Sequence, residues 1–410
     1  MINDVFLNYT NIYGFNLGKI ISKERLNNLD NTPISFACLR SDGLGTNPNE
    51  EDLYVYPDFD YSNKIVLKNK EIEWIPCFLM QGTQKHIFCP RSILYSAVYK
   101  LSEIGFEINI GFEPEFYLLN KDFSPFVQND SSIPAYNLNG SLSAFEFLSE
   151  ANRRLELSGI NANSIVHEGG ISQFEFGLAY NTPIAAVDQL VLFKIILKSL
   201  AQENNLIACF MPKPFENDFG SSVQINFSIK NSNDQKILFS SIAGVLKHAK
   251  ALSAFNCPTF NSYKRLFSTS ENLEVSWSPT TISYGINNRS TLLRYISKDN
   301  RVEYRSPDFS GNIYLSVAAV LFAIYDGIIN ELECPAPITQ NLFNNSTIGD
   351  ELEAIPCTLL EALNELKNDS FIMECMGIDF CKDYILNKKN EWFKDYLSID
   401  KRERWRYIDI

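Results

Sequence analysis

Residues 300–315 read NRVEYRSPDFSGNIYL, and they decide how the rest of the chain is organised. If this stretch begins as a strand, its period of two places Arg301, Glu303 and Arg305 on one face and Val302 and Tyr304 on the other. A row of cation, carboxylate and cation suits a solvated sheet edge as well as the wall of a charged site. The strand alone leaves both interpretations open, so the neighbouring segments must decide between them.

The composition predicts a folded, acidic protein. The chain has 410 residues, 45% of them hydrophobic, so it can bury a large core and form two or three domains. Its formal net charge is −13, and it has no run of Lys and Arg. This charge argues against nucleic acid or an anionic membrane as the main partner and favours a small substrate with a metal.

The cysteines and the apolar segments indicate a cytoplasmic protein. The nine cysteines are scattered and form no CxxC pair, which is typical of reduced thiols. We expect no signal peptide, because MINDVFLNYT lacks a basic region followed by an apolar core. The longest apolar run, residues 314–329, contains Asp326 and predicts a buried helix rather than a membrane span.

The first part of the chain predicts a small β-rich domain. Apolar spacing in residues 1–30 predicts a short helix and a turn at Gly18. Residues 34–79 contain the segments ISFACL, DLYVYPD, KIVL and EWIPCFLM, which predict strands separated by polar turns. A boundary is expected within residues 81–90, because QGTQKHIFCP is irregular and Pro90 suits the first turn of a helix.

The remainder mixes helical and strand-like patterns. Helical spacing occurs at residues 91–104, 143–158, 183–201, 235–256 and 312–330. Alternation typical of strands occurs in FEINIGFEPEFYLL, in QFEF after a Gly-Gly turn, and in SSVQINFSI. Each of these strands, and the one in residues 300–315, has an apolar face and a polar face. We therefore expect one curved sheet, with its apolar side on helices and its polar side lining a cavity.

The polar faces of these strands carry groups that bind metal and phosphate. Five carboxylates and one amide fall on them: Glu113, Glu115, Glu168, Glu175, Glu303 and Gln224. Neighbouring carboxylates repel each other unless a cation lies between them, and hard oxygen ligands suit Mg²⁺ or Mn²⁺. Arginines on the same faces suit phosphate and carboxylate groups. Together they predict phosphoryl transfer, although the loops GxxxxGK[ST] and GxGxxG are absent.

Six segments in order resemble one family: GFEPEFYLL, HEGGISQFEF, CFMPKPFENDFGSSVQINFS, NSYKRL, NNRSTLLR and NRVEYRSPDFSGNIYL. The chain is similar to the glutamine synthetase superfamily of ATP-dependent γ-glutamyl ligases, including γ-glutamylamine and γ-glutamylpolyamine synthetases. DLYVYPD and the C-terminal NEWFKDYLSIDKRERWRYIDI also match. The resemblance thus spans almost the whole chain.

The resemblance implies a fold, an assembly and a reaction. It implies an α+β protein, with a β-grasp-like domain at residues 1–88 and a glutamine-synthetase-type catalytic domain at residues 89–410, built on a curved antiparallel sheet flanked by helices. It implies a hexamer or double hexamer in which each active site lies between neighbouring subunits. In the reaction ATP, with Mg²⁺ or Mn²⁺, phosphorylates the γ-carboxylate of a glutamate-like acid, and an amine or ammonia then displaces phosphate.

The resemblance also implies roles for individual residues. Two metal subsites would consist of Glu115, Glu168 and Glu175, and of Glu113, Gln224 and Glu303. Arg289, Arg294 and Arg301 match phosphate-side arginines, Arg305 the one near the transferred phosphoryl group, and Arg265 the one that holds the substrate α-carboxylate. Ser228 and Lys298 match nucleotide contacts, Glu271 the glutamate of a closing flap, and Asp42 an aspartate that reaches the neighbouring subunit's site.

Several departures from the family pattern lie in the same segments. Gln224 and Asn226 stand where histidines are usual, and Phe219 precedes Gly220 where an asparagine normally recognises the amino group of glutamate. The flap segment FSTSENL lacks the usual Pro-Gly-Tyr. These changes favour an amine other than ammonia and an altered acyl substrate. Glutamine synthesis from ammonia and a non-catalytic ring-forming homologue are the alternatives.

Overall fold

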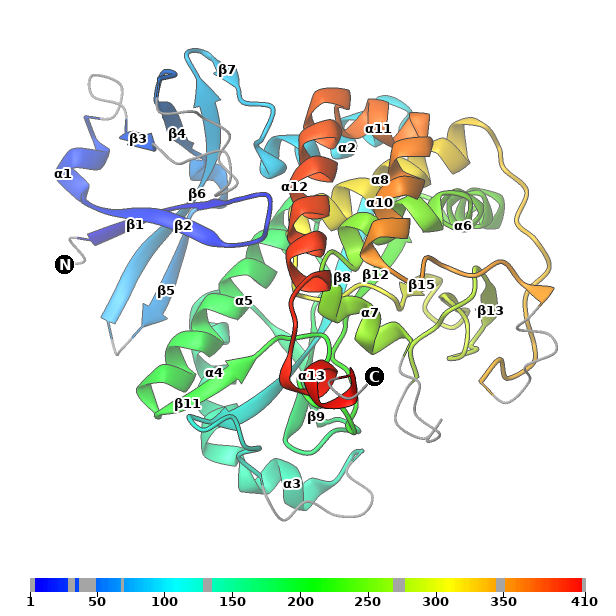
Figure 1. Ribbon diagram of the computed structural model, residues 1–410. Helices are drawn as coiled ribbons and strands as arrows, with labels where there is room; N and C mark the ends of the chain where they lie inside the picture. The colour runs from blue at the N-terminus through cyan, green and yellow to red at the C-terminus, as the bar shows by residue number, and fades with distance from the viewer. Residues whose placement is uncertain are drawn as a thin grey trace.

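The computed structural model describes residues 4–28, 34–36, 49–67, 70–127, 135–267, 277–343 and 351–407. Two β-sheets organise this part of the chain, and most of the helices gather around the second (Figure 1). The first sheet is drawn in blue at the upper left of the view, and the C-terminal helices α10, α11 and α12, in orange and red, lie to its right at the upper centre.

The first sheet has seven strands in the order β2-β1-β6-β4-β3, with β5 and β7 also paired to β6. The strands are β1 (Asp4–Thr10), β2 (Asn16–Ser22), β3 (Ile34–Phe36), β4 (Leu53–Pro57), β5 (Asn63–Leu67), β6 (Lys70–Gln81) and β7 (Gln84–Lys85). The short helix α1 (Lys23–Leu26) and the 3₁₀ turn η2 (Phe59–Tyr61) complete it. Strands lie at all four segments predicted between residues 34 and 79.

The helix predicted in residues 1–30 is wrong, because this segment is a β-hairpin of β1 and β2. Val5, Leu7 and Tyr9 are buried with the period of two that a strand requires. The chain reverses at Gly14, whose φ is +85°, rather than at Gly18. β1 also pairs in parallel with β6, more than sixty residues away. Pairing with β6 therefore makes this segment a strand, although its apolar residues have helical spacing.

The second sheet has eight strands in the order β13-β14-β15-β12-β8-β10-β9, with β11 also paired to β8. The strands are β8 (Ile108–Asn120), β9 (Ala162–His167), β10 (Gln173–Leu178), β11 (Leu206–Cys209), β12 (Val223–Ile229), β13 (Tyr284–Ile286), β14 (Leu293–Ile296) and β15 (Arg301–Tyr304). The expected strands are all present. β11, β13 and β14 are too short to give a clear alternating pattern, and the sequence did not predict them.

The helices of the larger part include every predicted one. They are α2 (Pro90–Glu103), α3 (Leu138–Ser143), α4 (Phe145–Leu157), α5 (Pro183–Glu203), α6 (Gln235–Asn256), α7 (Phe260–Leu266), α8 (Ile313–Ile329), α10 (Leu359–Asn368), α11 (Ser370–Met376), α12 (Ile378–Tyr396) and α13 (Lys401–Tyr407). α8 is buried on nearly all sides, as its apolar pattern predicts, and its one charged residue, Asp326, is buried with it. In the described residues, no helix is both long and apolar enough to cross a membrane.

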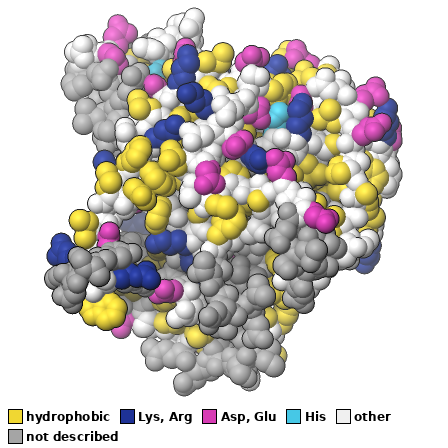
Figure 2. Space-filling model, turned by 45° about the vertical axis from the view of Figure 1, so that its right-hand side comes forward, with side chains coloured by type: hydrophobic (Ala, Val, Ile, Leu, Met, Phe, Trp, Pro, Cys, Tyr) yellow, Lys and Arg dark blue, Asp and Glu magenta, His cyan; other side chains and the backbone are white. Residues whose placement is uncertain are grey.

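α6 and α8 cross so closely that their contact depends on two glycines. A Cβ atom on Gly244 of α6 would collide with the backbone of Gly327 on α8, and one on Gly327 would collide with the backbone of Ser240. The two helices therefore form a compact layer that supports the second sheet. The outer surface is mixed, because Figure 2 shows basic and acidic side chains interspersed among hydrophobic ones on the face in view.

Candidate active site

A cavity of about 480 Å³ lies on the polar face of the second sheet. Thirteen predicted site residues line it: Glu113, Glu115, Glu168, Glu175, Phe219, Gly220, Gln224, Arg265, Arg289, Arg294, Arg301, Glu303 and Arg305. They come from five strands, from the loops between them and, for Arg265, from helix α7 (Phe260–Leu266). The row in residues 300–315 is therefore a cavity wall and not a solvated edge.

Strand register explains how residues far apart in sequence meet here. Gln224 on β12 lies opposite Glu113 on β8, and Glu175 on β10 lies opposite Glu115. On β14 and β15, Arg294 lies opposite Glu303. Directly opposed residues of an antiparallel pair project from the same face with Cβ atoms roughly 5 Å apart. The ladder thus brings acidic, amide and basic groups into one cavity.

Glu115 is held in place by hydrogen bonds from a neighbouring strand. The Ser222 hydroxyl donates to Glu115 Oε1 at 2.5 Å, and the Ser222 backbone N–H donates to Oε2 at 2.9 Å. Gln173 Nε2 donates to the same Oε2 at 3.3 Å. The carboxylate is therefore fixed in direction toward the cavity that it lines.

A tight turn places Glu168 beside it. The Gly170 N–H donates to Gln173 Oε1 at 2.8 Å, and the Glu168 N–H donates to the Gln173 carbonyl at 2.9 Å. A Cβ on Gly170 would overlap the hydroxyl of Tyr117, so the turn has room only for glycine there. The Gly-Gly pair in HEGG thus positions the carboxylate that precedes it.

The acidic side of the cavity has carboxyl groups whose ionisation is suppressed. Burial, with the negative charge of Glu115 second, raises the pKa of Glu168 to about 7 and that of Glu175 well above its usual value. Burial and the charge of Glu303 raise the pKa of Glu113. Low dielectric and like charges both disfavour the ionised form, so these groups would be stabilised as carboxylates by a cation placed among them.

The opposite side carries the positive charge. Glu303 is buried between two guanidinium groups, with Arg294 Nη1 at 2.8 Å from its Oε2 and Arg305 Nη1 at 2.5 Å from its Oε1. Burial opposes ionisation of Glu303, but the charges of Arg305 and Arg294 outweigh it and lower its pKa. Arg301 Nη1 lies 3.5 Å from Glu113 Oε1. Glu303 thus orients two arginines along the cavity wall.

Two amides stand between the acidic and basic groups. Gln224 satisfies its neighbours when its amide nitrogen faces them, donating to Glu113 Oε2 at 3.1 Å and to Glu303 Oε1 at 2.5 Å. Asn226 Nδ2 donates to Glu113 Oε1 at 3.2 Å and its oxygen accepts from Arg301. Gln224 thus bridges two predicted metal ligands as a donor, and its role as an oxygen ligand stays a prediction.

Arg265 also lines the cavity and packs against Gly220. Its guanidinium donates to the carbonyls of Ser306 at 2.7 Å and Arg305 at 3.0 Å, so it anchors the segment that follows β15. Phe219 lines the cavity as well, with its ring packed on Gly169 so closely that a Cβ there would lie 2.9 Å from it. Tyr117 donates to the Phe219 carbonyl at 2.7 Å. Phe219 is therefore a fixed aromatic wall.

Two predicted site residues that the structure describes, Ser228 and Lys298, do not line this cavity. Ser228 lines an adjoining cavity of about 580 Å³, and Glu113 and Arg301 line both. Lys298 is exposed in the turn between β14 and β15 and lines neither cavity. Asp42 and Glu271 lie outside the described residues.

Two aromatic residues of the cavity were missed by the sequence analysis. Tyr136 and Trp277 line it from loops, and the Trp277 carbonyl accepts from Arg305 Nη2 at 3.3 Å. Tyr136 has a positive φ of 61°, which is uncommon for a residue with a side chain. Neither residue belongs to an alternating segment, so no periodic signal could have indicated them.

The donor set fits a divalent cation. Glu115, Glu168 and Glu175 offer hard oxygen ligands on one wall, and burial together with mutual repulsion raises the pKa values of the latter two, a cost that a bound cation would offset. In the part of the chain that the structure describes, no three Asp, Glu, His or Cys side chains already stand close enough together to hold a metal. The carboxylates would have to draw together around the ion.

Comparison with known proteins agrees with this geometry. A family model described as the catalytic domain of glutamine synthetase matches residues 88–407. The glutamate--methylamine ligase of Methyloversatilis universalis is 31% identical over 427 residues, which cover 99% of this chain and 96% of that protein. The glutamine synthetase of Thermotoga maritima is 33% identical over 346 residues, covering 78% of this chain and 76% of that protein.

A solved structure described as a GmaS/ADP complex has the same fold. It matches with a TM-score of 0.91 at 26% sequence identity, and the match covers 100% of this chain and 97% of that one. The α+β fold with a curved sheet flanked by helices is thereby confirmed, and the sheet is antiparallel except for the parallel pair of β13 and β14. With the family model spanning most of its length, this chain belongs to the glutamine synthetase family.

Proposed function

We propose that this protein is an ATP-dependent carbon-nitrogen ligase that joins the γ-carboxylate of glutamate, or of a close analogue, to an amine. The observation that carries the proposal is the cavity in which five carboxylates face four arginines of β14, β15 and the loops beside them. The similarity to glutamate--methylamine ligase supports the choice of an amine. The reaction passes through a γ-glutamyl phosphate and forms ADP.

The acidic wall is proposed as the site of Mg²⁺ or Mn²⁺. Glu115, Glu168 and Glu175 would hold one ion, and Glu113 and Glu303, with Gln224, a second. When bound, such ions neutralise phosphate oxygens and so favour transfer of the phosphoryl group. The protein's own part is to present oxygen ligands from a rigid sheet, because Glu115 is already oriented by Ser222.

The basic wall is proposed to hold the phosphate groups of ATP. Arg305 and Arg294 are kept in place by Glu303, so their charge is preorganised for phosphate oxygens. The adjoining cavity, which contains Ser228, would take the nucleoside, since Glu113 and Arg301 border both spaces. Arg289 and Lys298 would add contacts to phosphate or nucleotide. Arg265 and Gly220 would border the acid substrate. Glu271 would accept a proton from the amine.

The aromatic residues support an amine larger than ammonia. Phe219 and Trp277 line the same cavity as the arginines, and an aromatic face attracts an alkylammonium ion and also buries its carbon atoms. Ammonia would gain the first interaction but not the second. The proposed substrate is therefore a primary amine with a small apolar substituent.

Two further features belong to the proposal. We propose the domain division at residues 88 and 89, supported by the start of the family match at residue 88 and by the two separate sheets. We also propose a ring of subunits in a reducing cytoplasm, with Asp42 reaching a neighbour's site. The eight cysteines that the structure describes are all free thiols, in keeping with such a compartment.

The test is phosphate release from ATP in the presence of glutamate and Mg²⁺ or Mn²⁺. Ammonia, methylamine, ethylamine, ethanolamine and putrescine are compared at matched concentrations, and the product is identified by mass spectrometry. We expect a γ-glutamylamide product and a higher kcat/KM with an alkylamine than with ammonia. A preference for ammonia would make the protein a glutamine synthetase.

A separate binding measurement distinguishes an enzyme from a non-catalytic ring-forming homologue. Isothermal titration with a non-hydrolysable ATP analogue should show binding that depends on Mg²⁺. The absence of both nucleotide binding and phosphate release with every amine would contradict the proposed function.

A further inference from the structure

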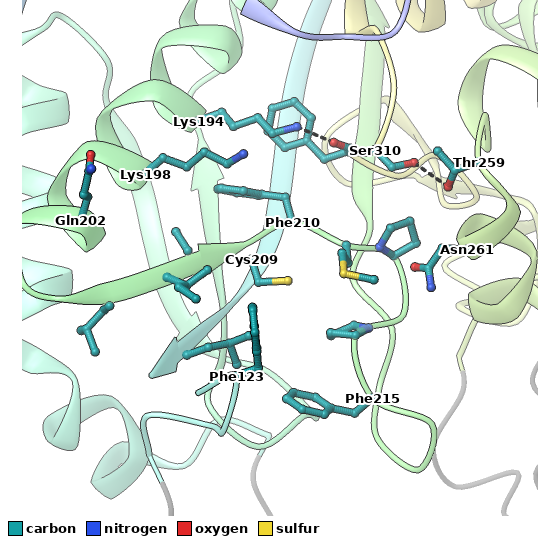
Figure 3. Close-up of a pocket in the computed structure, with 18 of the residues that line it drawn as sticks. Phe123, Lys194, Lys198, Gln202, Cys209, Phe210, Phe215, Thr259, Asn261 and Ser310 are labelled. Atoms are coloured by element: carbon teal, nitrogen blue, oxygen red, sulfur yellow. Dashed lines mark hydrogen bonds between the residues drawn. The ribbon is translucent and has the colours of Figure 1, made fainter. Parts of the chain in front are cut away.

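A second cavity, of about 870 Å³, shares no lining residue with the proposed active site. It lies between α5, β11, the turn after β8 and the loop that begins at Phe210, and Phe15 of the β1–β2 turn also borders it. Figure 3 shows Lys194 and Lys198 extending from α5 into this space, with Phe210 and Cys209 beside them and Phe123 and Phe215 on another side. Its volume is in the range of small-molecule sites.

The charged groups that line this cavity are all positive. Lys121, Lys194 and Lys198 border it, and no Asp or Glu is among the lining residues, although the whole chain carries a net charge of −13. In the described residues, no carboxylate lies within ion-pairing distance of these three ammonium groups. Lys194 donates to the carbonyl of Phe309 at 2.6 Å, and Lys121 to that of Leu206 at 3.0 Å.

Lys194 carries its charge at a cost. Its ammonium lies over the ring of Phe309, 4.2 Å from the centroid, and Lys198 stands one helical turn away. Burial, and then repulsion by Lys198, lowers the pKa of Lys194 to about 7, and the negative charge of Asp308 offsets this only in part. An anion bound between the two lysines would remove the repulsion and supply the missing counter-charge.

The rest of the cavity is apolar, and its rim is exposed. Phe15, Phe123 and Met211 are 66%, 68% and 47% exposed. Phe123 also has a φ of +68°, an unfavourable conformation for an aromatic residue, which holds its ring at the rim. Exposed apolar groups gathered around a cavity are typical of a ligand site.

We propose that this cavity binds a small organic anion, whose carboxylate or phosphate group lies at Lys194 and Lys198 and whose apolar body packs on Phe123, Phe210 and Phe215. The two parts of the cavity suit different parts of one ligand. The lysines attract a negative group, and the aromatic walls pack on carbon atoms. Because no lining residue is shared with the active site, this ligand is distinct from the substrates of the proposed reaction.

The test uses octanoate and octyl phosphate as probes in isothermal titration calorimetry with the full-length protein. Octanol lacks the charge, and acetate and inorganic phosphate lack the apolar body. We expect at least one octyl anion to bind with one site per chain, at least tenfold more tightly than octanol and than the matching small anion. The octyl anion that binds more tightly shows whether the cavity prefers a carboxylate or a phosphate group.

Two variants locate the site. Lys198→Gln should weaken octyl anion binding about tenfold, and Lys194→Met should do the same. Lys236→Gln removes an exposed lysine from the start of α6, where it pairs with Glu331, and should leave binding unchanged. Circular dichroism melting confirms that each variant is folded. The proposal is overturned if neither octyl anion binds, if octanol binds as well, or if both lysine variants bind like the wild type.

Discussion

Glu303 contacts both the basic and the acidic side of the active-site cavity. It pairs with Arg294 and Arg305 and, through the amide of Gln224, it is linked to Glu113. A strand with alternating charges could have been a solvated edge. Glu303 is instead buried, with 1% of its surface exposed. Its carboxylate stays ionised there because Arg294 and Arg305 on either side of it are cations.

Replacing Glu303 with Gln should lower turnover by about 100-fold or more, a loss typical of removing one preorganised electrostatic group. The substitution keeps the side-chain volume but frees two guanidinium groups from the position in which they face the cavity. Phosphate release measures the effect. Glu107→Gln, which breaks an exposed ion pair with Lys230, is the control and should leave turnover unchanged. If Glu303→Gln keeps its turnover within twofold of the wild type, the ion pairs of Glu303 with Arg294 and Arg305 have a structural role only.

Divalent metal should stabilise the folded protein through Glu168 and its neighbours. Binding to the native state alone adds about 2.7 kcal/mol when the free ion is at 100 times its Kd. We therefore expect Mg²⁺ or Mn²⁺ to raise the melting temperature, and Glu168→Gln to reduce that increase. Differential scanning calorimetry with and without EDTA makes the measurement. Equal increases in the wild type and the variant would remove Glu168 from the proposed ligands.

At the level of elements, α8 shows why a charged residue can interrupt a buried apolar helix. Asp326, 2% exposed, accepts from Lys247 at 2.7 Å and lies 3.1 Å from Nε2 of His248, both on α6. His248 Nδ1 in turn lies 2.6 Å from Asp369, the residue that caps α11. One carboxylate thus fastens α8 to α6, and through His248 to a third helix.

Asp326→Asn should lower the free energy of unfolding by about 3 kcal/mol at pH 7, because it removes the buried charge that pairs with Lys247 and leaves the buried His248 without its charged partner. Burial opposes ionisation of Asp326, but hydrogen bonds from Lys247 and His248 lower its pKa. Its contribution is therefore complete above the pKa of the unfolded chain, near 4, and is lost as pH falls through the lower folded value. The difference between wild type and variant should shrink accordingly in urea titrations at acid pH.

Asp379→Asn provides the control for this element. Its carboxylate, 81% exposed, faces Lys382 at 3.4 Å on α12, and an exposed pair of this kind contributes less than about 1 kcal/mol. A loss of similar size in both variants, or no change with pH for Asp326→Asn, would contradict the assigned role.

At the scale of the whole molecule, a buried ion cluster joins the first sheet to the helices of the larger part. Arg91, near the start of α2, pairs with Asp58 at 2.9 Å beside the first sheet and with Asp188 on α5. Tyr95 donates to Asp58 at 2.6 Å and Tyr314 to Asp188 at 2.5 Å. The cluster therefore fixes how the first sheet lies against the helices of the larger part.

Arg91→Met should destabilise the protein by about 3 kcal/mol or more, because two buried carboxylates lose their common cation. Equilibrium unfolding in guanidinium chloride, followed by tryptophan fluorescence, measures the change. Lys64→Met, on an exposed pair with Glu71 in the first sheet, is the matched control and should change stability by less than about 1 kcal/mol. A neutral effect of Arg91→Met would show that apolar packing alone holds the first sheet against these helices.

The amino-acid sequence by itself determined the strongly periodic elements and the residue types of the site. The strands of β6, β8, β12 and β15 and the helices α2, α5, α6 and α8 follow from alternation or helical spacing over whole segments. Glu113, Glu115, Glu175 and Glu303 could be named because each lies on the polar face of such a segment, whereas Glu168 and most of the arginines were named from the family resemblance. The family was identifiable from six segments in order.

Only the tertiary structure decided the features that depend on distant partners. β1 is a strand because β6 pairs with it, and Glu303 is a buried ion because β12 and β14 bring Gln224 and Arg294 to it. The paths of loops place Tyr136 and Trp277 at the active-site cavity. Helix packing places the lysines of α5 at the second cavity. The physical reason is that local periodicity records which face of a segment is apolar, whereas burial, strand register and the balance of charge in a cavity arise from residues far apart in the chain.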